Sequence, residues 1–103
     1  MTALEKPRVI SKEMSLVPDE FRRQLARLAE RLTLAVEREQ NRYHLTGPDS
    51  LRVCIDLEQL PPRRIASISL PVMQVRIEFL DATSEQFAEF KHCFDLYFRK
   101  GGG

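Results

Sequence analysis

The residues of this chain that are able to do chemistry are few, and they form no recognisable catalytic set. The 103 residues include two histidines, His44 and His92, and two cysteines, Cys54 and Cys93. Neither histidine has a carboxylate or a thiol at a spacing that guarantees contact, and the cysteine spacing fits no metal site. No nucleotide-binding loop or hydrolase elbow is present. The sequence therefore favours a protein without catalytic residues, cofactor or metal ion.

Cys54 is the one candidate for a reactive thiol. Alternation along its strand places it opposite the core face, beside Asp56, and Arg52 lies two residues away on that same face. A thiol becomes nucleophilic when nearby positive charge lowers its pKa. One arginine is a weak signal, so we expect Cys54 to be inert and Cys93 to be a partly buried core residue. Two cysteines are also too few for a disulfide framework, and a reducing cytoplasm is the expected location.

Arginines supply a signal for binding rather than for catalysis. The net charge is only +1, which argues against a general polyanion binder. The middle of the chain differs, because residues 21–64 hold nine basic residues, all arginine, against six acidic ones. Arg23, Arg27 and Arg31 recur every four residues, so on a helix they form one ridge. Any anionic partner should meet this part of the chain, although a solvated helix face is the simpler interpretation.

A second candidate contact is the pair Arg63 and Arg64, which follows a stiff Pro-Pro in "PPRR". Guanidinium groups pair bidentately with phosphate oxygens. Together with the ridge, this pair defines our alternative hypothesis, a nucleic-acid-binding module with weak and salt-sensitive affinity. The segment "PPRR" also suits a solvent-exposed loop that only connects two elements.

The C-terminal part predicts a helix near 83–99 with an aromatic face. Thr83 or Ser84 can cap it, with a Glu or Gln about three residues on. The rings at helical spacing are Phe87, Phe90, Phe94, Tyr97 and Phe98. Such a stripe is usually core. One helix with so many rings exceeds what a small sheet covers, so we assign the surplus, represented by Phe98, to a partner interface.

The three glycines at 101–103 invite a comparison with ubiquitin-like and sulfur-carrier proteins, which end in a reactive Gly-Gly. In those proteins the tail leaves a strand, whereas here it follows a predicted helix. Arg99 and Lys100 before Gly101 are the usual helix stop. We therefore predict that Gly101 ends the helix.

The remaining elements follow from hydrophobic periodicity. Residues 1–15 mix charge with little pattern and predict a mobile tail, which leaves one domain over 16–100. Helical spacing of apolar residues predicts a helix over 18–31. Residues 32–39 fit either a continued helix or a strand, and strand is favoured narrowly. No apolar run is long enough for a membrane span.

Alternation predicts the later strands. Tyr43 and Leu45 share one face, and four apolar residues from Leu51 to Leu57 share the next. "LPPRR" should end that strand. A further extended run covers 65–79, and its change of phase predicts a bulge or bend near Pro71, on a sheet edge.

These elements predict an α+β fold: a mainly antiparallel sheet of three or four strands, packed by an N-terminal helix and an aromatic-rich C-terminal helix. The expected function is that of a non-catalytic interaction or accessory protein that binds a protein partner or forms a homodimer.

Overall fold

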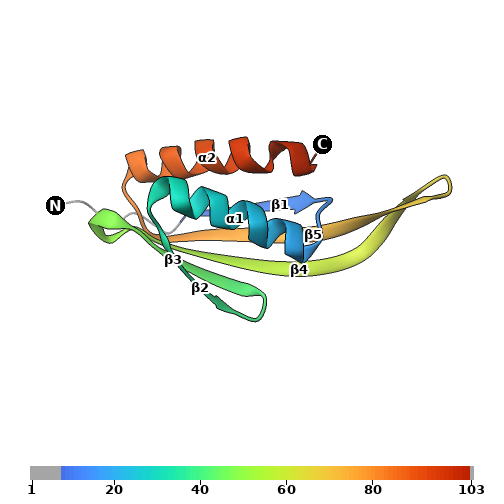
Figure 1. The fold of residues 1–103 in the computed structure, drawn as a ribbon, viewed down its shortest axis with the longest axis horizontal. Coiled ribbons are helices and arrows are strands. Elements are labelled where there is room, and N and C mark those ends of the chain that lie inside the picture. The colour runs from blue at the N-terminus through green and yellow to red at the C-terminus, as the bar shows by residue number, and fades with distance from the viewer. Residues whose placement is uncertain (1–7, 103) are drawn as a thin grey trace.

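The computed structural model describes residues 8–102, with side chains as far as Phe98. Its elements occur in the order β1 (Arg8–Met14), α1 (Pro18–Leu32), β2 (Ala35–Glu39), β3 (Arg42–Thr46), the short 3-10 helix η1 (Pro48–Ser50), β4 (Arg52–Ile65), β5 (Ile68–Asp81) and α2 (Ser84–Gly102). The strands form one antiparallel sheet in the order β1-β5-β4-β3-β2, and both helices lie on the same side of it (Figure 1). The α+β architecture and the aromatic C-terminal helix are confirmed.

The sheet has five strands in the described residues rather than three or four, and β1 is the strand that the sequence did not reveal. Residues 8–14, predicted as a tail, pair along their whole length with β5. Ile10 and Met14 face the core, but Lys12 lies between them and hides the alternation. The Lys12 amine reaches Asp95 on α2 at 3.1 Å, which leaves its aliphatic stem against the core side. Residues 1–7 lie outside the described part, so the prediction of a tail is not tested for them.

The core lies between the sheet and the two helices. The strand residues predicted to face inward are buried: Tyr43, Leu45, Leu51, Val53, Ile55, Leu57, Val75, Ile77 and Phe79. Phe21 on α1 is fully buried and contacts rings of both layers, with centroids 4.8 Å from Phe98 and 5.9 Å from Tyr43. Phe94 stacks on Phe98 at 4.2 Å. The aromatic stripe is therefore core, as its spacing predicts.

The end of α1 resolves the ambiguity over residues 32–39. The helix ends at Leu32, where Thr33 takes a left-handed conformation with φ 59° and its N–H donates to the carbonyl of Glu30. The strand β2 then runs from Ala35 to Glu39, so the preference for strand is confirmed there. All five of its residues are exposed, because β2 is an edge strand that extends away from the helices (Figure 1).

Two predicted boundaries are wrong. β4 does not end at "LPPRR" but continues through it to Ile65. At the other end of the chain, Gly101 does not end α2, which includes Gly102. A glycine ends a helix by taking a positive φ, and no described glycine has one.

The long hairpin of β4 and β5 gives the molecule its elongated shape, 55 Å by 25 Å by 24 Å. Pairing with β1 reaches only Met73, and pairing with β3 reaches only Asp56. Beyond them, residues 59–72 project as a two-stranded arm past the helices (Figure 1). The predicted irregularity near Pro71 is confirmed: Leu60 pairs with Val72 and Arg63 with Leu70, so Pro61 and Pro62 together oppose Pro71. All three prolines, which lack an N–H, lie where the strands have no outer neighbour.

Candidate functional site

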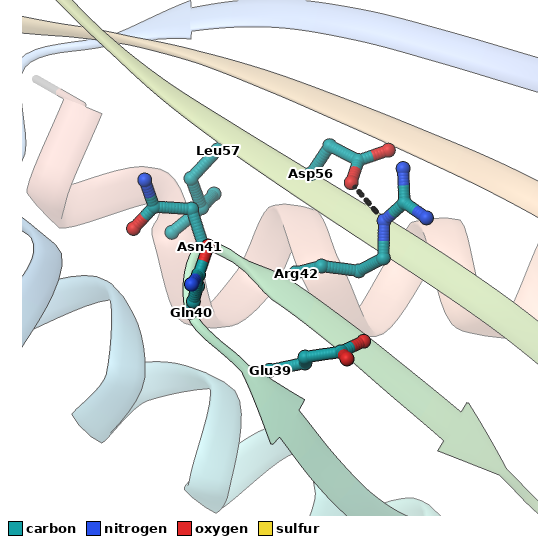
Figure 2. Close-up of a pocket in the computed structure, with 6 residues that line it drawn as sticks. All are labelled: Glu39, Gln40, Asn41, Arg42, Asp56 and Leu57. Atoms are coloured by element: carbon teal, nitrogen blue, oxygen red, sulfur yellow. Dashed lines mark hydrogen bonds and ion pairs between the residues drawn. The ribbon is translucent and has the colours of Figure 1, made fainter.

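The helix-free face of the sheet carries a connected set of charged side chains. Cross-strand register aligns five residues in one row across all strands: Glu39, Arg42, Asp56, Arg76 and Ser11. Charges alternate along this row, which is the arrangement that stabilises neighbouring strands. The Arg42 Nε donates to Asp56 Oδ1 at 2.5 Å (Figure 2). Arg76 Nη1 lies 3.8 Å from the other oxygen of Asp56.

The turn between β2 and β3 forms a shallow recess beside this row. Its lining residues are Glu39, Gln40, Asn41, Arg42, Asp56 and Leu57 (Figure 2). Gln40 takes a left-handed φ of 57°, and the Asn41 carbonyl accepts the Leu57 N–H at 2.9 Å. The only guanidinium in the lining, that of Arg42, is already paired with Asp56. The recess therefore offers a polar surface but no unpaired guanidinium for an anionic ligand.

A second row of the same face brings together residues that sequence spacing did not connect. His44, Cys54 and Glu78 lie directly opposite one another on three adjacent strands. Cys54 is on the helix-free face, as predicted, yet it is only 6% exposed because long neighbouring side chains cover it. Burial raises the pKa of the Cys54 thiol, and the Asp56 carboxylate raises it further, against smaller opposite effects of Arg42 and Arg76. The thiol is therefore held in its neutral, less nucleophilic form.

The arm differs from the rest of this face because it is apolar. Five side chains fall on the helix-free side by register, and we call them the arm stripe: Leu60, Ile65, Ile68, Leu70 and Val72. Ile65 and Ile68 form a cross-strand pair at the tip and are 54% and 58% exposed. The Arg63 guanidinium reaches back over β5 to Glu13 on β1 at 3.3 Å. Leu60 and Leu70 are half-buried and Val72 is buried, so the uncovered part of the arm stripe is the Ile65–Ile68 pair at the tip, and the nearby Arg63 is paired with Glu13.

The bulge at Pro61 and Pro62 produces this arrangement. Side chains of a strand alternate between faces, and one extra residue shifts the phase of those beyond it. Leu60 points to the helix-free side, and without the bulge Ile65 would point to the opposite side. With the bulge, Ile65 and Ile68 both point to the helix-free side. By the same register, Leu70 and Val72 lie on the helix-free side.

The predicted arginine ridge is exposed on α1. Arg23, Arg27 and Arg31 are exposed, and none forms an ion pair with another described residue. Arg27 lies over the Tyr97 ring, 5.6 Å from its centroid. A shallow groove between the helices is lined by Arg27, Glu30, Arg31 and Tyr97, so a carboxylate lies within the basic surface.

The other predicted contact residues are separated from this ridge. Arg63 and Arg64 lie in the arm, at the opposite end of the molecule from the C-terminal turn of α1 (Figure 1). They also point to opposite faces, since Arg63 pairs with Leu70 and Arg64 with Ser69. Phe98, which was predicted to contact a partner, lies in the core instead: it is 2% exposed, stacks on Phe94 and is tilted against Phe21.

The chain matches no model of a known protein family, and it has no significant match among curated proteins. None of the helices described is both long and apolar enough to cross a membrane. In the part of the chain that the structure describes, no three His, Cys, Asp or Glu side chains are grouped so as to hold a metal ion. The function therefore has to be inferred from the geometry of the surface.

Proposed function

We propose that this chain is a non-catalytic interaction domain that binds a protein partner through the arm and the adjoining helix-free face. The observation that carries the proposal is the exposure of Ile65 and Ile68 at the tip of an arm with no core beneath it. A two-stranded hairpin is marginally stable by itself in water. An arm that keeps apolar side chains uncovered gains stability when a second surface packs on it.

The rest of the exposed surface supports this choice of the arm. Other large apolar residues are exposed singly, such as Leu96 on α2 at 45% and Leu80 at 43%. Isolated residues of this kind are normal on protein surfaces. The edge strand β2 is a poor docking edge, because Glu37, Arg38 and Glu39 place charge along it. Among the residues that the structure describes, Ile65 and Ile68 are exposed large apolar residues that lie side by side on one surface.

Replacing both tip isoleucines with lysine (Ile65→Lys, Ile68→Lys) should abolish binding without affecting folding. Even if each side chain loses only about 1 kcal/mol of burial, affinity falls about thirtyfold. The thermal midpoint should stay unchanged, since both residues are already exposed in the free chain. The measurement combines sedimentation of the purified protein with recovery of partners from native extract, analysed separately for protein and nucleic acid.

The matched control is Leu96→Lys, which removes an equally exposed apolar residue from α2 and should leave binding at the level of the unaltered chain. Unchanged self-association and unchanged partner recovery in the double arm variant would refute the proposal.

A second candidate function, nucleic-acid binding, is favoured by one observation: the three exposed guanidinium groups on one side of α1. Because the arm arginines are remote from them, at most about three phosphates can be contacted at once. The expected log–log salt slope is then about −2 to −3, with weak affinity. Fluorescence anisotropy of a labelled oligonucleotide at two salt concentrations measures it.

For this second candidate, Arg27→Glu with Arg31→Glu should remove the remaining binding, whereas Arg38→Glu on β2 should reduce it only slightly. Tight binding at physiological salt that the paired α1 substitutions abolish would make nucleic acid the principal partner.

A further inference from the structure

We propose that the partner of this surface is a second copy of the chain, and that the two sheets pack helix-free face to helix-free face about a two-fold axis parallel to the β4–β5 hairpin. This inference rests on the proposed function and adds the identity of the partner and the geometry of the interface. In such an arrangement the two arms point in the same direction, and β4 of each copy lies over β5 of the other.

The register of the hairpin makes its face self-complementary under this rotation. The axis runs between β4 and β5, so each residue of β4 meets the residue of the partner that is its own cross-strand neighbour. The successive pairs on the helix-free face are Ile65 with Ile68, Arg63 with Leu70, Leu60 with Val72, Glu58 with Gln74, Asp56 with Arg76, and Cys54 with Glu78. Beyond a register shift, Arg52 pairs with Asp81. No pair joins like charges, and two pairs, Asp56 with Arg76 and Arg52 with Asp81, join opposite charges.

The same rotation also places the outer strands favourably. β1 of one copy lies over β3 of the other, so Ser11 meets Arg42 and Val9 meets His44. Like charges placed directly opposite each other across an interface disfavour association strongly. Their absence from every aligned position is consistent with a surface that packs on its own copy.

In the alternative orientation the two arm tips point in opposite directions, and like charges do face each other. An axis across the strands places β4 over β4 and β5 over β5, so the residue at the axis meets itself. With the arms centred on each other, Arg63 faces Arg63, and a shift toward the body brings Glu58 to Glu58 or Asp56 to Asp56. The two-fold axis along the hairpin is therefore the orientation that the charges select.

The area of the surface indicates that the sheet body must take part in the interface together with the arm. The arm is about 20 Å long and about 10 Å wide at ordinary strand spacings. Its footprint is about 200 Å², well under the roughly 800 Å² per partner of a stable interface. The whole five-stranded face provides about 700 Å² on the same spacings. Only an arrangement that covers the sheet body as well as the arm approaches the size of a stable interface.

The test reverses the charges of Asp56 and Arg76, which meet across the proposed interface. Asp56→Arg alone places arginine against Arg76 across the interface, and Arg76→Asp alone places aspartate against Asp56. Each variant should self-associate at least about tenfold more weakly than the unaltered chain. An equimolar mixture of the two should recover the association, because every trans pair in the mixed dimer is again oppositely charged.

The mixture separates the interface from contacts within one chain. Asp56 and Arg76 also lie 3.8 Å apart in the same molecule, and mixing leaves that internal pair broken in both variants. Recovery can therefore come only from contacts between copies. As a matched control, reversing the surface pair on α1 with Asp19→Arg or Arg22→Asp should leave association unchanged.

Sedimentation equilibrium at about 10–100 μM decides the outcome, with circular dichroism to establish that each variant folds. If a reversed variant does not fold, Gln74→Glu and Glu58→Lys form a second set: Gln74→Glu alone should weaken the dimer, and mixing with Glu58→Lys should restore it. A monomeric unaltered chain, or mixtures that fail to recover association, would overturn the inference. Arm-dependent binding of another protein would still leave the proposed function standing, so the two failures are distinguishable.

Discussion

Phe21→Ala should destabilise the protein by about 3–5 kcal/mol, the range for removing a fully buried aromatic side chain. Phe21 on α1 is the ring that joins the helix layer to the sheet. It is 0% exposed, and it contacts Tyr43 on β3 as well as Phe94 and Phe98 on α2. A small domain has about 5–15 kcal/mol of stability in total. The variant should therefore be largely unfolded near 37 °C, as measured by urea denaturation followed by circular dichroism.

The control for this substitution is Phe87→Ala, at the end of the same aromatic cluster. Phe87 is only partly buried and packs on Phe79 with centroids 4.8 Å apart. Its loss should destabilise the fold by about half as much, since part of the ring is already in water. Equal effects of the two substitutions, or a loss below about 1 kcal/mol for Phe21→Ala, would show that Phe21 is not the residue that holds the layers together.

The parts of the fold that could be predicted are those in which one residue pattern has one physical explanation. Alternation from Leu51 to Leu57 requires a strand with one buried face, and the model buries all four apolar residues. The aromatic spacing after Phe87 requires a helix with a ring-lined face. At β1 the pattern fails because a lysine occupies a core-side position and is accommodated by Asp95, a residue far away in the sequence.

The surface features were harder to predict because they depend on register. His44, Cys54 and Glu78 become neighbours only when the turn at Pro48–Ser50 sets the pairing of β3 with β4 and the turn at Ala66 sets the pairing of β4 with β5. The arm stripe needs in addition the bulge at the two prolines, which the sequence indicated near Pro71 but could not assign to β4. Local propensity does not contain these long-range relations, and the partner-binding assignment of Phe98 failed for the same reason.

Met14→Asp should destabilise the protein by about 3–5 kcal/mol, although this residue lies in a segment whose sequence resembles a tail. Met14 is 9% exposed and opposes Met73 at the end of β1. The substitution removes a buried apolar side chain and buries a carboxylate in its place. Both changes disfavour the folded state. Urea denaturation measures the loss.

The comparison with Ser11→Asp makes the Met14 result specific to the strand. Ser11 lies on the same strand but on the helix-free face, where it is exposed and opposite Arg76. An aspartate there should change stability by no more than about 0.5 kcal/mol. If residues 8–14 were a tail, both substitutions would have equally small effects. A large loss for Met14→Asp beside a negligible one for Ser11→Asp requires that β1 be paired in the sheet with Met14 on the core face and Ser11 on the helix-free face. That is also the face on which Ser11 takes part in the proposed dimer.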